Sequence, residues 1–325
     1  MSGQTKKYDV ICIGQVVQDI MVTDIPENAL TRDSDTVMAG QVLLTSGGDA
    51  VNEACMLAKL GNHSALLTRL DNRNVGDMIY GDLTRGGVDT SLLIRPDDCK
   101  TFSTVVVVKE NGDHSFLIGP GENFMLKMSD IDLSVFEETR AVTAGSIYAL
   151  GELDTGGLAV IFKKAQEAGA ITVADMNFDT LGLGPHAIDS VYPYTDYLMP
   201  SYEEAVYVTG EKDPDKIADV FLAAGVKNVV LKIGAEGCFF KNAEKRFFTD
   251  PYEITPVDTT GCGDNFVAAF LHGLLKGMGP EECAEFACGA GALNSQGIGA
   301  HLHIRSEAQI REFMASAKKR ELGRK

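Results

Sequence analysis

Several things that the sequence lacks narrow the class of protein. No apolar run approaches the ~20 residues that a membrane-spanning helix needs. The residues before a predicted strand at 8–13 lack the apolar core and cleavage site of a signal peptide. Positive charge is scarce, with 29 lysines and arginines against 46 acidic residues, which disfavours a nucleic-acid partner. We therefore expect a soluble, cytoplasmic protein that binds neither nucleic acid nor membrane.

Cysteine motifs and two common nucleotide-binding fingerprints are also missing. The seven cysteines contain no C-x-x-C pair, so neither a zinc site nor a disulfide framework is indicated. The turn at Gly14 lacks the later glycines of G-x-G-x-x-G, and G-x-x-x-x-G-K-[ST] does not occur. A Rossmann dehydrogenase and a P-loop enzyme are both disfavoured. With a net charge of −17, any phosphate site must be built locally, from backbone amides, a lysine or Mg²⁺.

Strands and helices alternate from about residue 140 onwards. The predicted strands are 141–147, 171–175, 197–200 and 229–232, and the helical patterns between them are 158–168, 202–208 and 217–224. Short apolar strands that alternate with helices predict an α/β fold, with a mostly parallel sheet sandwiched by helices. The functional edge of such a sheet lies at the carboxyl ends of its strands. Asp175, Glu204 and Asp264 follow strands or begin helices, so we expect them at that edge.

Two segments, residues 16–45 and 98–120, break the alternation. The second contains a predicted hairpin, with strands at 104–108 and 114–118 joined by Glu110-Asn111-Gly112-Asp113, because Asn-Gly is a strong hairpin signal. A small β layer inserted into an α/β domain resembles a lid, although a decorative edge hairpin would give the same pattern. Without repeats or linker-like composition, we expect one domain, residues 1–325, with one inserted β layer.

The most informative stretch is Asp258-Thr259-Thr260-Gly261-Cys262-Gly263-Asp264-Asn265-Phe266, which leads into a helical pattern. Its glycines allow a sharp turn close to a ligand, and the free N–H groups of the helix start favour an anion there. A carboxylate repels a resting phosphate, so we predict that Asp264 faces a hydroxyl that attacks one. A simple helix cap is the alternative for Asp264, and a cap needs only one of these residues. Cys262 adjoins a helix start, which can lower a thiol pKa, but a small residue in a tight turn is the simpler interpretation.

A second glycine-rich helix start lies near the beginning of the chain. Gly47 and Gly48 leave room for a ligand to touch the backbone. Asn52 in the first helical turn can donate and accept hydrogen bonds, and Asp19 can accept from two vicinal hydroxyls. Sugars offer such hydroxyls. An ordinary helix-start Asn and an ordinary turn Asp are the alternatives.

These motifs together resemble the ribokinase-like carbohydrate kinases, also called the phosphofructokinase-B family. The resemblance covers nearly the whole chain, from Gly14…Asp19 through Gly47-Gly48…Asn52 to the stretch at 258–264. Weaker similarities lie in Lys232-Ile233-Gly234-Ala235-Glu236-Gly237, in Asp175-Met176-Asn177 and in residues 289–300. The resemblance implies a ribokinase-like α/β fold with a small inserted β lid.

The resemblance also implies a role for each matching position. Asp264 would be the general base, beside an anion hole formed by Gly261, Cys262 and Gly263. The sugar would be held by Asp19, Gly47, Gly48 and Asn52. The ATP side would comprise Lys232, Gly234, Gly237, Thr260 and Cys288, with Glu204 as the candidate metal ligand for Mg²⁺. Relatives often respond to a monovalent cation near the loop of Asp258 and dimerise through the lid, so a cation site and a homodimer are two further hypotheses.

Four positions depart from the family pattern, and the mildest departure is Cys262, which replaces the usual small alanine in a turn that should tolerate it. Ser201-Tyr202-Glu203-Glu204 keeps the Glu of the family's Asn-x-x-Glu and replaces the Asn, so the water network around Mg²⁺ must differ. Asp179 stands where an arginine often follows the Asp-x-Asn turn, which disfavours a strongly anionic substrate on that side. Cys288 replaces a common polar residue, which predicts mostly apolar contacts to the adenine.

We therefore predict an ATP-dependent kinase that phosphorylates a hydroxyl of a small sugar or sugar derivative. A primary hydroxyl is the first candidate. A nucleoside kinase on the same fold and a catalytically silent sugar-binding regulator are the alternatives, and the retained Asp264 and Glu204 argue against the regulator. Vitamin kinases of the broader superfamily would be favoured only if residues 98–120 formed no hairpin. No motif names the sugar. Candidates for contact with it are Arg95, Phe102, Phe116, Glu122 and Asn123.

Overall fold

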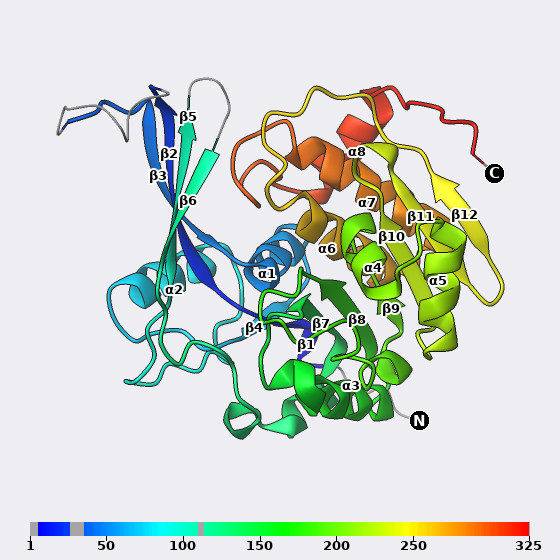
Figure 1. Ribbon diagram of the computed structural model, residues 1–325, viewed down its shortest axis with the longest axis horizontal. Helices are drawn as coiled ribbons and strands as arrows, with labels where there is room; N and C mark the ends of the chain where they lie inside the picture. The colour runs from blue at the N-terminus through cyan, green and yellow to red at the C-terminus, as the bar shows by residue number, and fades with distance from the viewer. Residues whose placement is uncertain (1–5, 27–35, 110–113, 325) are drawn as a thin grey trace.

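The larger part of the structure is an eight-stranded sheet covered by helices. The computed structural model describes residues 6–26, 36–109 and 114–324 (Figure 1). In spatial order the strands are β12 (Arg246–Thr249), β11 (Cys238–Asn242), β10 (Asn228–Lys232), β9 (Tyr197–Leu198), β8 (Ile171–Met176), β7 (Thr139–Ile147), β1 (Tyr8–Ile13) and β4 (Ser64–Leu67). All pairs from β10 to β4 are parallel, and only the pairs that involve β11 and β12 are antiparallel. The predicted mostly parallel sheet is confirmed.

Helices bury both faces of this sheet. One face packs against α1 (Asp49–Lys59), α2 (Val75–Arg85), α6 (Cys262–Leu275), α7 (Pro280–Asn294) and α8 (Glu307–Ser316), and the other against α3 (Leu158–Glu167), α4 (Tyr202–Thr209) and α5 (Pro214–Ala223). Along β1, Val10 and Cys12 belong to the first core, and Ile11 and Ile13 to the second. A strand buried on both sides must be apolar at every position, which is why β1 is a continuous hydrophobic run. Within the described residues, no helix is both long enough and apolar enough to cross a bilayer.

A separate four-stranded sheet stands beside this body (Figure 1). Its order is β3 (Gln41–Gly47), β2 (Val17–Ile25), β5 (Ser103–Lys109) and β6 (His114–Gly119). The central pair β2 and β5 is parallel, and the two outer pairs are antiparallel. The prediction of a small β lid built from two distant segments is therefore confirmed, and so is the pairing of the hairpin strands. The predicted turn at 110–113 lies outside the described residues.

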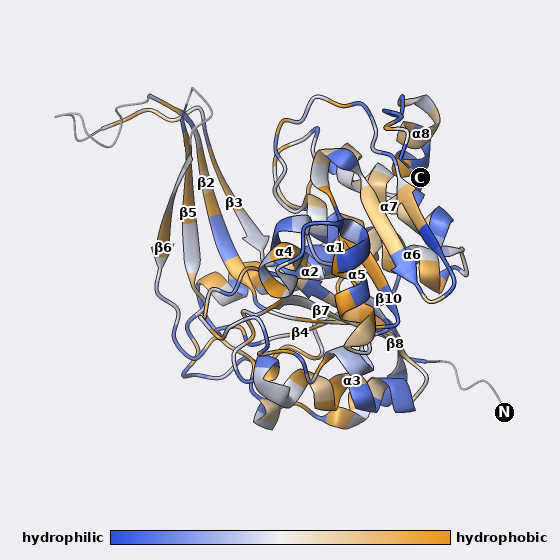
Figure 2. Cartoon of the chain, turned by 45° about the vertical axis from the view of Figure 1, so that its right-hand side comes forward, coloured by the Kyte–Doolittle hydropathy of each residue, from blue (hydrophilic) through white to orange (hydrophobic). Residues whose placement is uncertain are grey.

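The lid strands contain both hydrophobic and hydrophilic residues (Figure 2). On its outer strands, Val42, Leu44, Leu117 and Ile118 are all at least half exposed. Val42, Leu44 and Leu117 share one face of the lid, and Ile118 lies on the other. Apolar side chains exposed together on one face mark a candidate protein–protein surface. The homodimer through the lid stays a prediction.

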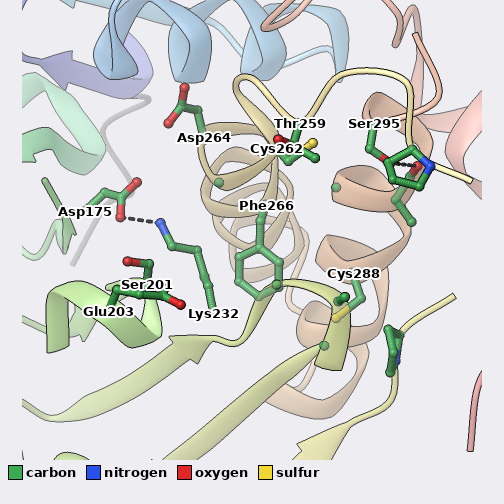
Figure 3. Close-up of a pocket in the computed structure, with 18 of the residues that line it drawn as sticks. Asp175, Ser201, Glu203, Lys232, Thr259, Cys262, Asp264, Phe266, Cys288 and Ser295 are labelled. Atoms are coloured by element: carbon green, nitrogen blue, oxygen red, sulfur yellow. Dashed lines mark hydrogen bonds and ion pairs between the residues drawn. The ribbon is translucent and has the colours of Figure 1, made fainter. Parts of the chain in front are cut away.

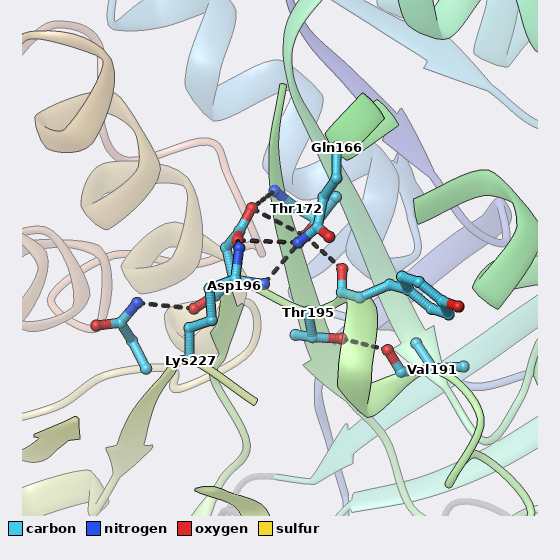
Figure 4. A network of polar contacts seen from close by, with 8 residues as sticks. Gln166, Thr172, Val191, Thr195, Asp196 and Lys227 are labelled. Atoms are coloured by element: carbon cyan, nitrogen blue, oxygen red, sulfur yellow. Dashed lines mark hydrogen bonds and ion pairs between the residues drawn. The ribbon is translucent and has the colours of Figure 1, made fainter. Parts of the chain in front are cut away.

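The amino-terminal edge of the main sheet carries a saturated polar network (Figure 4). Asp196, just before β9, accepts hydrogen bonds from the backbone N–H of Thr172 at 2.9 Å and from the side chain of Gln166 at 2.9 Å. Lys227 forms an ion pair with the same carboxylate at 2.6 Å. These donors come from α3, from β8 and from the residue before β10, so one side chain ties three successive units of the sheet together.

Candidate active site

Two cavities meet at the carboxyl-terminal edge of the sheet, where the prediction placed the functional groups. The larger has a volume of about 490 Å³ and the smaller about 260 Å³. Asp49, Asn177 and Asp264 line both of them. Asp264 therefore lies where the two cavities join.

The glycine turn before α6, the candidate anion site, is held in a defined conformation by its neighbours. Gly261 is the N-cap residue and has φ 71°, a left-handed conformation that favours glycine. A Cβ on Gly261 would also lie 2.2 Å from the carbonyl oxygen of Ala300, so no larger residue fits without a shift of the backbone. The side chain of Asn265 pins the turn by donating to the carbonyl oxygens of Gly261 and Ala300, each at 2.6 Å. Gly261 borders the smaller cavity, and Cys262 and Gly263 border the larger one.

Asp264 is buried and is held by a chain of two side chains. It is 8% exposed, and the Nδ2 group of Asn52 donates to its Oδ2 at 2.6 Å. Nδ1 of His301 lies 2.8 Å from Oδ1 of Asn52, an atom that can only accept, so His301 donates. Burial lowers the pKa of His301 to about 4, which keeps the ring neutral. His301 thus fixes the orientation of the Asn52 amide, and the Asn52 amide in turn fixes the carboxylate of Asp264.

Other carboxylates surround Asp264. Burial raises its pKa well above the usual range, and the nearby charges of Asp49 and Asp175 raise it further. Asp49 begins α1, where the hydroxyl of Ser146 donates to it. Burial and then Asp175 raise the pKa of Asp49 as well. Such a group of mutually repelling, partly desolvated carboxylates is typical of a functional site.

Lys232 provides the positive charge of the larger cavity. Its Nζ lies 2.5 Å from Oδ1 of Asp175, and Figure 3 shows this pair beside the carboxylate of Asp264. Burial lowers the pKa of Lys232, but Asp175 and then Glu204 together raise it above its usual value. The ammonium would also lie only 3.3 Å from a Cβ on Gly263, so it reaches the start of α6. The ammonium of Lys232 and the N-terminus of α6 therefore lie close together at the larger cavity.

Glu204 lies in the first turn of α4 and faces the larger cavity. Its Oε2 accepts from the backbone N–H of Ser201 at 2.7 Å, so part of its bonding capacity is used in a capping box. Burial raises its pKa to about 7, opposed by Lys232. In the described part of the chain, no three His, Cys, Asp or Glu residues are grouped to hold a metal. Mg²⁺ usually keeps several waters and binds through one or two carboxylates and substrate phosphates, so Glu204 is a residue that could hold it.

The remaining candidates for the ATP side do not all lie together. Gly234, Gly237 and Cys288 line the larger cavity with Lys232. Thr260 lines the smaller cavity only, beside Gly261, although the resemblance places it on the ATP side.

The larger cavity has an apolar wall that suits an adenine ring. Phe266, Ile254 and the buried Cys288 line it (Figure 3).

The Cys262 thiol also lines the larger cavity. Burial raises its pKa to about 11, so the structure does not support an activated thiol. The simpler interpretation, a small residue that fits a tight turn, is favoured.

The smaller cavity lies between the lid and the glycine turn. Asp19 on β2, Gly48 and Asn52 line it, as does Phe102 of the lid region. Burial raises the pKa of Asp19 to about 6. Gly47 acts differently, because a Cβ there would lie 2.2 Å from Oδ2 of Asp19. Its lack of a side chain makes room for the Asp19 carboxylate.

Asp49 and His301 are the two residues that sequence reasoning missed. Asp49 follows the glycine pair directly, and its place at a helix start was a signal that could have indicated the cavity. His301 lies in the loop between α7 and α8, and nothing in its local sequence points to Asn52.

The comparisons with known proteins agree with this geometry. The family model described as pfkB family carbohydrate kinase matches residues 7–306. The chain therefore belongs to the pfkB family of carbohydrate kinases, and the predicted ribokinase-like identity is confirmed.

Individual relatives are distant but cover most of the chain. It is 26% identical over 293 residues to "Probable fructokinase-5" of Arabidopsis thaliana, which covers 85% of this chain and 90% of that protein. A structure of Arabidopsis thaliana ribokinase complexed with ribose and ATP superposes with a TM-score of 0.78 at 23% identity, covering 94% of this chain and 98% of that one. An Escherichia coli structure in complex with ATP and Mg²⁺ gives a TM-score of 0.80 at 20% identity, covering 95% and 99%. These two structures show a common fold.

Proposed function

We propose that this protein is an ATP-dependent kinase that transfers the γ-phosphoryl group to a hydroxyl, a primary one, of a small sugar or sugar derivative. The observation that carries the proposal is the place of Asp264. It borders both cavities and lies in the first turn of α6, beside the amides of residues 261–263. One cavity then holds the phosphoryl donor and the other the acceptor, with Asp264 between them.

The larger cavity suits the nucleotide. Its apolar wall at Phe266 and Cys288 would take the base, and Lys232 would take the phosphates at the other end. Mg²⁺ would sit between the phosphates and Glu204, where it would neutralise charge on the phosphate oxygens. The ATP complexes of similar structures support this arrangement.

The smaller cavity then holds the sugar beside the base. Asp19 accepts from sugar hydroxyls, and Asn52 holds Oδ2 of Asp264 so that Oδ1 faces the attacking hydroxyl. Holding the two reactants in line supplies roughly 7–11 kcal/mol, and each well-placed amide of the anion hole contributes about 3–4 kcal/mol. The β lid covers the sugar and keeps out water that would otherwise hydrolyse ATP.

Replacement of the base tests this proposal. Asp264→Asn keeps the shape and the hydrogen bond to Asn52 but removes the proton acceptor. We expect kcat to fall by roughly 10²–10⁴, with the ATP dissociation constant unchanged within about threefold by calorimetry. Near-normal turnover in the variant would remove Asp264 from the role of base.

A substrate panel separates the competing functions. We expect ADP release with ATP, Mg²⁺ and a small sugar, and none above background with nucleosides. Turnover of nucleosides alone would indicate a nucleoside kinase, and tight sugar binding without ADP release would indicate a regulator. The same assay, repeated with and without K⁺, tests the monovalent cation near the loop of Asp258.

The exposed apolar residues of the lid support a homodimer. Val42, Leu44 and Leu117, which share one face of the lid, would be covered by the lid of a second copy. Sedimentation analysis should give a dimer for the native chain and a monomer for Leu44→Asp combined with Leu117→Asp. A monomeric native chain at micromolar concentration would contradict this assembly.

A further inference from the structure

The smaller cavity has an unusual charge inventory. Of the described residues that line it, three are carboxylates and none is a lysine, arginine or histidine. The carboxylates are Asp19, Asp49 and Asp264. The other polar groups there are amides and hydroxyls, such as Asn177 and Ser146, which carry no charge.

Three basic side chains that could have balanced these carboxylates interact with other groups. Lys232 lines the larger cavity and pairs with Asp175 at 2.5 Å. Arg95, which sequence reasoning held as a candidate for substrate contact, instead pairs with Asp77 at 2.5 Å. Lys59 donates to the carbonyl oxygen of His301.

Asp49 borders both cavities, so a ligand in either one meets its carboxylate. It is the first residue of α1, and Gly48 before it gives the helix no side-chain cap. A bare helix N-terminus attracts an anion, but here the protein supplies that anion itself. Ser146 and Asn177 both donate to Oδ2 of Asp49, which fixes the carboxylate between the two cavities.

We propose that the smaller cavity takes a sugar that is uncharged or bears an amino group, that it rejects sugars bearing a carboxylate or phosphate, and that Asp49 sets this preference. This inference rests on the proposed function and narrows its substrate class. An anionic sugar would bring a further negative charge beside three carboxylates that are partly shielded from solvent, where charges interact more strongly than in water. An ammonium group would pair with Asp19 or Asp49.

The titration of these groups supports the same conclusion. Burial raises the pKa of Asp19 to about 6, and the pKa of Asp49 is also raised, by burial and then by Asp175. Carboxylates in this state gain from a nearby cation and lose from a further anion.

The first experiment compares three classes of probe with the native protein. The neutral probes are D-ribose and D-fructose, the amino sugars are D-glucosamine and 1-amino-1-deoxy-D-fructose, and the acids are D-gluconate and 2-dehydro-3-deoxy-D-gluconate. ADP release gives kcat/KM, and thermal shift gives binding without turnover. We expect the best neutral or amino sugar to exceed both acids by about 100-fold in kcat/KM, which corresponds to about 2.7 kcal/mol. An acid within tenfold of the best probe would overturn the proposal.

The second experiment tests Asp49 itself. In Asp49→Asn the ratio of kcat/KM for acid to kcat/KM for neutral sugar should rise about tenfold, because a carboxylate that repels the acid has been removed. The ratio is taken within one variant, so a general loss of rate cancels. Glu244→Gln removes the same charge from an exposed turn between β11 and β12 and should leave the ratio unchanged. An unchanged ratio in Asp49→Asn would remove Asp49 from the specificity role.

The two readouts separate this inference from the proposed function. Binding in the expected order of classes without ADP release would defeat the kinase proposal and keep the cavity's preference. ADP release with an acid as the best substrate would keep the kinase and defeat the preference. A cavity that binds no probe of any class would defeat both.

Discussion

The two edges of the main sheet surround an aspartate of low solvent exposure in opposite ways. At the amino-terminal edge, Asp196 has a backbone N–H, an amide and an ammonium group as donors. At the carboxyl-terminal edge, Asp264 has Asn52 as a donor and faces Asp49 and Asp175. A carboxylate with a full set of donors stabilises a fold, whereas one crowded by like charges costs stability and is available for chemistry. The amino-terminal edge therefore contributes to stability, and the carboxyl-terminal edge holds the candidate active site.

The largest effect on stability is expected at the first edge. Asp196→Ala leaves the Thr172 N–H and the Gln166 amide without their acceptor, while the exposed Lys227 ammonium is taken up by water, so we expect a loss of about 1–3 kcal/mol in the free energy of unfolding. Urea unfolding measures this loss. The kcat of the same variant should stay within about twofold, because the network lies at the opposite edge from the cavities. Asp196→Asn, which keeps one acceptor oxygen, should lose only about 1 kcal/mol. A large fall in kcat with unchanged stability would reverse the comparison.

The chain of contacts behind the base comes next. In His301→Ala the amide of Asn52 loses the donor that fixes its orientation, so Asp264 is held less well, and we expect kcat to fall roughly 10–100-fold with the KM for ATP unchanged. His301→Gln restores a side-chain N–H and should recover most of the loss. If a folded alanine variant kept native kcat, His301 would have no positioning role.

Removal of the strained charge should stabilise the protein. Burial raises the folded pKa of Asp264 above its unfolded value, so the native protein favours the protonated form. The stability that this protonation gives is complete at low pH and is lost as the pH rises through the folded pKa. Asp264→Asn should therefore have a Tm roughly 1–3 °C above the native protein at pH 8, with the difference vanishing in acid. A lower Tm at pH 8 would show that the carboxylate stabilises the fold.

The smallest effect is a shift in the pH profile. Asp264 acts as a base only when ionised, so activity rises with pH through its pKa. Asp49 is, after burial, the largest cause of the raised pKa of Asp264, so Asp49→Asn should move the rising limb of kcat to lower pH. The Glu244→Gln control should leave the limb in place. A limb that moves to higher pH would contradict the arrangement.

The parts of the fold with a local signal could be predicted from the sequence. The strand expected at 8–13 coincides with β1, because the apolar run and its flanking residues define both ends. The hairpin strands expected at 104–108 and 114–118 fall within β5 and β6. The helix start near Asp264 followed from the glycines and from the helical pattern after them, and α6 begins at Cys262.

What depends on tertiary contact could not be predicted. His301 reaches Asn52 across 249 positions of sequence, through a loop with no periodic pattern. Thr260 and Thr259 are neighbours in sequence, yet the turn directs them to different cavities. Asp49 shows its charge conflict only when β8 brings Asp175 beside it. In each case the missing information is which distant groups share one small volume.

A crystal structure with a non-hydrolysable ATP analogue, Mg²⁺ and a neutral sugar is the most direct test of the central claim. We expect the γ-phosphate to contact the amides of residues 261–263, with a sugar hydroxyl in line behind it and within hydrogen-bond distance of the Asp264 carboxylate. A nucleotide bound outside the larger cavity, or a sugar whose hydroxyls all lie beyond reach of Asp264, would contradict it.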